Sequence, residues 1–334
     1  METTVTALWD TTGTEVVKAL ALERRAAGSV SSGLALTLVA VVDEKLVAEA
    51  EQAATAAAAQ HPCRLLIVVR RRPDAPEPRL DAEVSVGGRL GPGEAVVMRM
   101  YGRLSLHAES VVLPLLAPDA PVVTWWFGEP PHLVAHDPLG VIADRRITDC
   151  ARAADCLGAL RGRGDDYAPG DTDLAWTRTT LWRSLCASAY DSLSGDPKSV
   201  TVSGEAANPS RALLAGWLKR RLGVTVAVED TAGPGVTGVE LVVGDDTVRI
   251  DRGDGLTATL SRTGQPDRAM PLPRRELGDL LAEELRRLDA DETYAESLEV
   301  VTGLAGLSDR APKREHIWQD PMDTQDPDPA LTTS

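Results

Sequence analysis

The feature that most constrains the fold is a pair of apolar segments separated by an alanine-rich one. Residues 34–42 read LALTLVAVV and residues 64–70 read RLLIVVR, and both have the length of a β-strand. The alanines that follow Asp43 and Glu44 and continue to Gln60 predict a helix. Strands that are apolar on both faces are typical of a parallel sheet, and a strand–helix–strand order supplies the crossover. The sequence therefore predicts a βαβ unit in the first half of the chain.

A second unit of this kind follows SGDPKS at residues 194–199, where turn-forming residues cluster. Residues 200–203 and 224–228 predict strands, and residues 209–222 predict the helix between them. That helix has clear end signals, because Asn208 can cap it, Pro209 suits its first turn and Gly223 can end it. Several short strands follow, two of them joined by a hairpin turn at Gly244–Asp246.

These patterns predict a mixed α/β (α+β) fold with two domains, each built on a βαβ-like unit and a mixed sheet flanked by helices. We expect the first domain at residues 1–195 and the second at 196–306. In the second, residues 274–288 predict an amphipathic helix. The Pro-, Asp- and Thr-rich residues 307–334 are expected to form a disordered acidic tail. Residues 80–86 and 94–104 predict two antiparallel strands joined by the glycine-rich GGRLGPG.

The charge balance argues against some classes of partner. The formal net charge is −15, whereas nucleic acids and anionic membranes attract basic proteins. The N-terminal residues lack the basic start and apolar run of a signal peptide. Three prolines and Asp119 interrupt the longest apolar region, residues 111–127, so it does not predict a membrane span. We therefore expect a cytoplasmic protein that binds neither nucleic acid nor membrane.

The cysteines and histidines do not form a recognisable metal or disulfide pattern. The four cysteines are scattered without a CxxC motif and are predicted to be buried thiols. His132 and His136 have the spacing of two ligands on one helix face, but prolines flank them and no HExxH glutamate is present. We expect two loop histidines and neither a metal site nor a cofactor.

Residues 173–191, DLAWTRTTLWRSLCASAYD, concentrate large and polar side chains in a chain with few aromatics. As a helix, they place Trp182 and Cys186 on an apolar side with Arg178 in the same sector. An arginine there needs a carboxylate or carbonyl partner. Alternatively, the helix starts with Thr180 as N-cap, and Arg178 lies in the preceding turn. Either arrangement predicts a structural element rather than a catalytic one.

Two other segments are candidate binding sites. Trp125 and Trp126 end a predicted parallel strand, where one indole can face the core and the other an interface. The second candidate is the strand–loop–helix junction of residues 203–211. A helix N-terminus there could bind an anion through these residues: Ser203, Gly204, Asn208, Ser210 and Arg211. The junction matches neither GxxxxGK[ST] nor GxGxxG, and an ordinary capped turn is the preferred interpretation.

Five blocks of sequence together resemble a known family. HPCRLLIVV, PVVTWWFGEPP, DLAWTRTTLWRSL with its trailing AYD, LLAGWLKRRLG and LDADETYAESL are similar, in this order, to the actinobacterial glucose-6-phosphate dehydrogenase assembly proteins, OpcA. The resemblance covers about residue 9 to residue 298, and its specificity lies in the combination of the blocks. The redox control through cysteines of cyanobacterial relatives is not carried over, because this chain has no evident cysteine pair.

The resemblance implies a non-catalytic effector that binds glucose-6-phosphate dehydrogenase and promotes its active oligomer. It would thereby support NADPH production in the oxidative pentose phosphate pathway. The side chains first expected to make the contact, or to support the fold behind it, are Trp125, Trp126, Arg178, Trp182 and Arg183. One alternative is an α/β protein or enzyme that holds a phosphosugar or nucleotide at residues 203–211, and another is a scaffold for a different partner.

Overall fold

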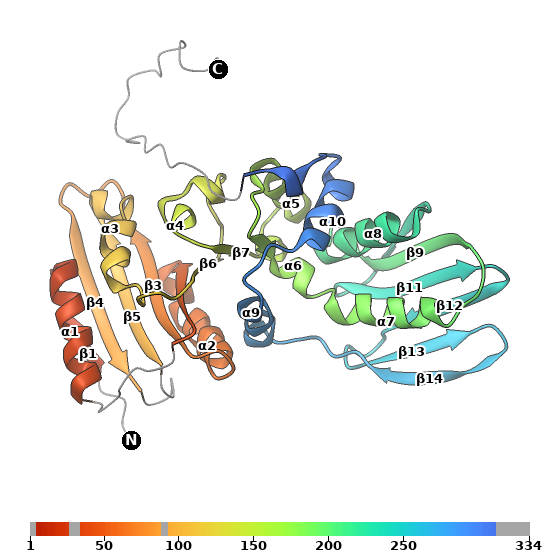
Figure 1. The fold of residues 1–334 in the computed structure, drawn as a ribbon, viewed down its shortest axis with the longest axis horizontal. Helices are drawn as coiled ribbons and strands as arrows, with labels where there is room; N and C mark the ends of the chain where they lie inside the picture. Colours follow the sequence, from red (N-terminus) through yellow and green to blue (C-terminus); the bar gives the residue numbers. More distant parts are fainter. Residues whose placement is uncertain (1–4, 27–33, 88–92, 312–334) are drawn as a thin grey trace, which may run out of the picture.

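The computed structural model describes residues 5–26, 34–87 and 93–311. They form two mixed sheets, one of eight strands and one of six, with helices packed against both. Figure 1 shows the two sheets toward opposite ends of an elongated molecule, with α9 among the helices that lie between them. The predicted mixed α/β fold is confirmed.

The first sheet contains the strands of the N-terminal half. They are β1 (Val5–Leu8), β2 (Leu36–Val42), β3 (Cys63–Arg71), β4 (Arg79–Val86), β5 (Glu94–Tyr101), β6 (Val122–Phe127), β7 (Arg145–Thr148) and β8 (Asp171–Asp173). Their spatial order is β1-β4-β5-β3-β2-β6-β7-β8. The strands from β5 to β8 run parallel, whereas β4 is antiparallel to both β1 and β5. The predicted crossover is confirmed, because α2 (Val47–Ala58) joins the parallel neighbours β2 and β3.

Both faces of this sheet are covered, which explains its continuous apolar strands. On one face, Leu65 and Ile67 of β3 pack with α2 and with α9 (Leu277–Arg286). On the other face, Leu66 and Val68 pack with α1 (Gly13–Ala26) and the short α3 (Glu109–Val112). Alternate side chains of a strand point to opposite faces, so a strand that is buried on both faces must be apolar throughout.

The second sheet is smaller and mainly antiparallel. Its strands are β9 (Pro197–Glu205), β10 (Val226–Thr231), β11 (Val236–Val243), β12 (Asp246–Asp251), β13 (Thr257–Arg262) and β14 (Gln265–Pro271), in the order β10-β9-β11-β12-β13-β14. The helix α8 (Pro209–Leu222) joins the parallel pair β9 and β10. The predicted end signals of α8 are confirmed, because the Asn208 side chain accepts a hydrogen bond from Arg211 N and Gly223 adopts φ 67°. β11 and β12 form the predicted hairpin.

Helices from distant parts of the chain join the two halves. α7 (Thr180–Asp191) packs with α8 against the second sheet through Trp182 and Cys186. α10 (Glu292–Thr302) packs with α5 (Cys156–Asp166), the short α6 (Leu174–Thr177) and α8. α9 follows the second sheet in the chain and yet packs on α2 of the first. The predicted boundaries at residues 195 and 306 remain a prediction, and the packing shows that helices cross between the halves.

Three details differ from the sequence-based expectations. Residues 173–191 do not form one continuous helix, because the chain turns at Arg178 and Thr179; the structure is closer to the alternative in which the helix starts near Thr180. The sequence also predicts a helix at residues 107–116, with Pro114 as a possible early end; these residues form only α3 and a turn of 3₁₀-helix, since Pro114 cannot donate a backbone hydrogen bond. The strands β1, β7, β8 and β14 and the helix α10 were not expected. Most of the GGRLGPG connection and of the predicted tail lies outside the described residues.

The close approach of α9 to α2 leads to a stability prediction. A Cβ atom added at Gly278 would lie 2.6 Å from the Cβ of Ala56, and Gly162 has open space at that position. Gly278→Val should therefore lower the free energy of unfolding by about 1–3 kcal/mol, because it forces the helices apart. Gly162→Val, the same change within α5, is the control. Denaturant unfolding that shows equal effects for both variants would contradict the importance of this contact.

Candidate functional site

A polar pocket of about 770 Å³ lies where α7, α9 and the start of α10 come together. Many of its side chains come from two of the sequence blocks noted above, DLAWTRTTLWRSL and LDADETYAESL, which are more than a hundred residues apart in the chain, and others come from α9. The lining also includes Arg145 of β7 in the first sheet. The pocket is thus built from both halves of the protein.

The start of α6 is held by a buried carboxylate. Asp173 is the N-cap residue of α6, and its side chain accepts a hydrogen bond from Ala175 N. The same carboxylate accepts hydrogen bonds from Cys150 N and from the hydroxyl of Thr148. An aspartate at an N-cap satisfies backbone donors that the helix leaves free. These bonds determine the direction of α6 and therefore the position of Trp176 within it.

Trp176 forms the aromatic wall of the pocket and is 1% exposed. Its indole Nε1 donates to Asp291 Oδ2 at 2.8 Å, and its ring lies 6.0 Å from that of Tyr294. Asp291 is also the N-cap residue of α10, where it accepts from Tyr294 N. One aspartate therefore connects α6 to the start of α10.

Arg183 lies over the ring of Trp176, with its guanidinium carbon 3.7 Å from the ring centroid. The guanidinium donates to the hydroxyl oxygens of Thr179 and Thr180 at 3.0 and 2.9 Å. Among the described residues it forms no ion pair. Burial lowers the pKa of Arg183 below its ordinary value; nearby acids oppose this shift, and the charge of Arg287 adds to it. Arg183 thus carries a half-buried positive charge with no carboxylate bound to it.

The floor of the pocket is a buried network. Arg145 donates to Glu284 Oε2 at 2.5 Å and to the carbonyl oxygen of Asp289 at 2.6 Å. The other oxygen of Glu284 accepts from the hydroxyl of Thr177 at 2.6 Å. The side chains of Arg145 and Glu284 are only 3% and 7% exposed. This network links the first sheet, α6 and α9.

Arg183 is the one predicted contact residue that lines this pocket. Arg178 instead forms a bidentate ion pair with Asp149, at 2.6 and 2.7 Å. Although burial opposes its charged form, that carboxylate holds the pKa of Arg178 above its ordinary value. Arg178 is the C-cap residue of α6, in the turn before α7. It therefore has both the carboxylate partner and the turn position that the sequence suggested. The N-cap of α7 is Thr179 rather than Thr180.

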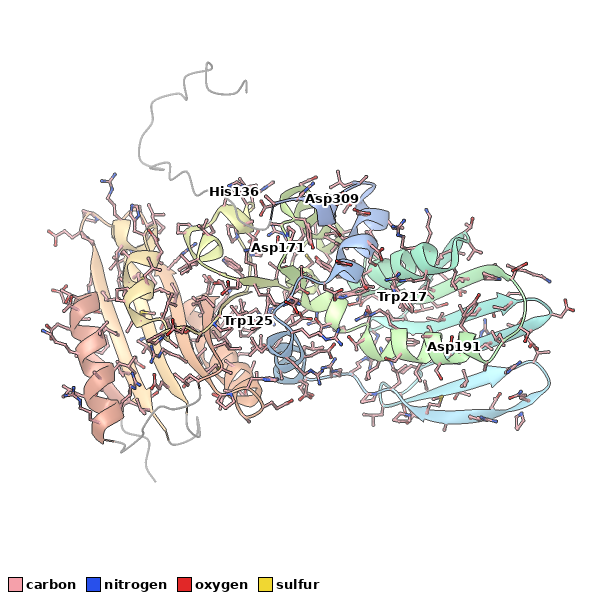
Figure 2. All side chains as sticks on the ribbon, viewed as in Figure 1. Trp125, His136, Asp171, Asp191, Trp217 and Asp309 are labelled. Atoms are coloured by element: carbon pink, nitrogen blue, oxygen red, sulfur yellow. The ribbon has the colours of Figure 1, made fainter. Side chains whose placement is uncertain are left out.

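The three predicted tryptophans are buried. Trp182 is 2% exposed and packs under the second sheet, beneath the guanidinium of Arg252. Trp125 (labelled in Figure 2) and Trp126 are 0% and 1% exposed. Trp125 packs on the face of the first sheet that carries α2, whereas Trp126 approaches Gly140. In this conformation the three indoles support the fold, and their role in partner contact remains a prediction.

In the junction at residues 203–211, the guanidinium group of Arg211 is already hydrogen-bonded to other groups of the protein. Arg211 donates to the carbonyl oxygens of Gly204 and Glu229 and to Asp230 Oδ1. The hydroxyl of Ser203 donates to Glu229, Asn208 caps α8, and Ser210 is 5% exposed. Anion binding at this junction therefore remains a prediction. Arg211, the arginine of the predicted set, is bonded to these internal groups and is not available to an anion in this conformation.

The sequence patterns did not point to the residues that shape the pocket around Arg183. These are Arg145, Trp176, Glu284, Arg286, Arg287 and Asp291. One of these residues had a sequence signal: Asp291, in LDADETYAESL, directly precedes a helical segment, which is the position of an N-cap residue. The others depend on α9 folding back onto the first sheet, which no local pattern shows.

Within the described residues, no cluster of three or more histidine, cysteine or acidic side chains has the arrangement of a metal site. His136 lies in a short 3₁₀ turn (Figure 2), and His132 lies in the segment before it. No helix in the described ranges combines the length and apolar character needed to cross a bilayer.

Comparison with known proteins gave two family matches. Residues 54–165 match a model described as the glucose-6-phosphate dehydrogenase subunit N-terminal domain, and residues 169–298 match the C-terminal domain of the same subunit. The search of curated proteins gave no significant match.

Similar solved structures include a 3-ketoreductase from Actinomadura kijaniata, at 11% identity and a TM-score of 0.43, which covers 80% of this chain and 95% of that one. Another is an NAD-binding oxidoreductase from Klebsiella pneumoniae, at 10% identity and a TM-score of 0.47, with the same coverage.

The Arg178–Asp149 pair yields a prediction for folding. Asp149 is 1% exposed on its side chain and Arg178 is 33% exposed. Arg178→Ala should lower the free energy of unfolding by roughly 2–3 kcal/mol, because it leaves a buried carboxylate without its cation. Arg268→Ala, at an exposed arginine without an ion pair in the described chain, should change it by less than about 0.5 kcal/mol. Similar values for the two variants in denaturant unfolding would refute this role.

The cysteines yield a second prediction, for thiol reactivity. Burial raises the pKa of Cys63 and of Cys186 to about 12, and it also raises that of Cys150. Cys156 is only partly buried. A colorimetric thiol reagent should therefore modify at most Cys156 in the native protein and all four cysteines after unfolding. Cys156→Ser should abolish the reaction of the native protein with the reagent. Fast modification of a second thiol in the native protein would contradict the burial of the other three cysteines.

Proposed function

The chain belongs to the glucose-6-phosphate dehydrogenase assembly protein family, OpcA, and we propose that it binds this dehydrogenase and promotes its active oligomer without catalysing a reaction itself. The observation that carries the proposal is the pair of family matches. They cover both domains of the subunit in order and leave only three residues between them.

The proposed mechanism is differential binding. An effector shifts an equilibrium only by the difference in its affinity for the two states. A protein that binds the active oligomer more tightly than the dissociated form raises activity with no chemistry of its own.

We assign the predicted contact residues two roles. Arg183 is partly exposed at the pocket and is the proposed direct contact. Trp125, Trp126, Trp182 and the ion-paired Arg178 support the elements behind the contact surface. An arginine stacked on a tryptophan is a suitable anchor, because its planar group is already oriented for a partner carboxylate.

The biological setting follows from the proposed partner. By raising dehydrogenase activity in the cytoplasm, the protein would support NADPH production in the oxidative pentose phosphate pathway. The net charge of −15 disfavours contact with nucleic acid or anionic lipid and favours a partner surface with basic character.

The proposal predicts a complex that can be isolated. The chain and the dehydrogenase of the same organism should co-purify, sediment as a larger species than either protein alone, and show a higher dehydrogenase activity as the chain is titrated. Arg183→Glu should weaken the complex at least about tenfold, equivalent to about 1.4 kcal/mol. Arg268→Glu, a matched charge change on β14, should leave it unchanged.

Thermal unfolding of both variants must first show that they fold. If the two wild-type proteins are folded and neither associates nor changes in activity, the proposed function is wrong. If the complex forms and both variants bind equally well, the function holds and the contact surface does not include Arg183.

A further inference from the structure

We propose that the pocket between α7, α9 and residues 289–293 binds a small phosphorylated sugar or polyol, with Arg183, Arg286 and Arg287 holding its phosphate. This inference goes beyond the assembly function, since it concerns a ligand of the chain by itself. The pocket volume of about 770 Å³ lies in the range of small-molecule sites, roughly 300–1,000 Å³.

The first argument is that no carboxylate is in direct contact with Arg183, although acids such as Asp291 and Glu283 lie near enough to favour its charge. Its guanidinium rests on Trp176 and donates to two threonine hydroxyls, and no carboxylate of the described chain pairs with it. A partly buried cation without a counter-ion is unfavourable, and a bound anion removes that cost. The stack on Trp176 also orients the planar group, which favours two parallel hydrogen bonds to phosphate oxygens.

The second argument is the presence of two further arginines at the same pocket. Arg286 is the last residue of α9 and Arg287 follows it; both are exposed and line the pocket. Neither makes an ion pair within the ranges that the structure describes. The charge of Arg287 acts against that of Arg183, which places the two cations within electrostatic reach of each other. Three unpaired guanidinium groups around one pocket favour a phosphate.

The acids of the pocket determine the rest of the ligand. Glu284 is paired with Arg145, Glu283 with Arg275, and Asp291 accepts from the indole of Trp176. Asp289 and Glu292 also line the pocket, and their exposed side chains have no cation bound to them among the described residues.

Two such carboxylates repel a polyphosphate and accept hydrogen bonds from hydroxyl groups. The hydroxyl of Ser184 adds a further polar partner, whereas that of Thr180 already donates to Glu283. The lining therefore selects one phosphate monoester on a hydroxyl-rich compound over a nucleoside triphosphate or a simple anion.

The test uses the purified full chain without any dehydrogenase. Calorimetric titration with glucose 6-phosphate and with ribose 5-phosphate should give a Kd below about 1 mM for at least one of them. Glucose and inorganic phosphate, titrated separately, should each bind at least tenfold more weakly. Bound sugar phosphate should also raise the midpoint of thermal unfolding.

Two variants locate the site. Arg183→Gln and Arg287→Gln should each weaken sugar-phosphate binding at least tenfold, and Arg268→Gln should not. Arg287 is exposed, so Arg287→Gln should fold normally and can test the proposal even if Arg183→Gln fails to fold.

Three results would overturn the proposal. They are no binding of either sugar phosphate, equal binding of inorganic phosphate, and binding that both variants leave unchanged. Because Arg183 is also the proposed dehydrogenase contact, ligand and partner binding would be reciprocally linked. The titration involves no dehydrogenase, so its failure is distinct from failure of the assembly function.

Discussion

The buried pair of Arg145 and Glu284 is the interaction on which the arrangement of the two halves depends. Arg145 belongs to the first sheet, whereas Glu284 belongs to a helix that follows the second sheet in the chain. Two charges removed from water require each other, and loss of either would leave the other unpaired inside the protein. Thr177 and the carbonyl oxygen of Asp289 complete the hydrogen bonds of this network. As a result α9 is held against the first sheet at one register.

The pocket is a consequence of this constraint. Once α9 is held in place, its last residues and the segment leading to α10 must pass in front of α6 and α7. Asp291 then binds the indole of Trp176, and Arg183 covers that ring from α7. The arginine lies in a partly dehydrated position without a carboxylate bound to it. Its charge is available to a partner protein or a ligand, and both the proposed contact and the proposed ligand site use it.

An assembly factor needs a rigid surface more than it needs reactive groups. The tryptophans of the predicted contact set are buried, and Arg178 is paired with Asp149, so in this conformation these residues stabilise the fold. Preorganisation reduces the ordering cost of association. The shared position of the proposed ligand and partner contacts would also let a metabolite bias the association, because binding at linked sites is reciprocal.

The sequence by itself determined the local architecture. Its continuous apolar runs required a parallel sheet that is covered on both faces, and the residues around α8 set both ends of that helix, because these effects act over a few neighbouring residues. Five blocks in a fixed order also identified the family. Only the tertiary structure decided that α9 returns to the first sheet, that Trp125 and Trp126 are both enclosed, and that Arg178 is paired while Arg183 is not. Pairing and burial depend on residues that are distant in the chain, and no local pattern specifies which of them meet.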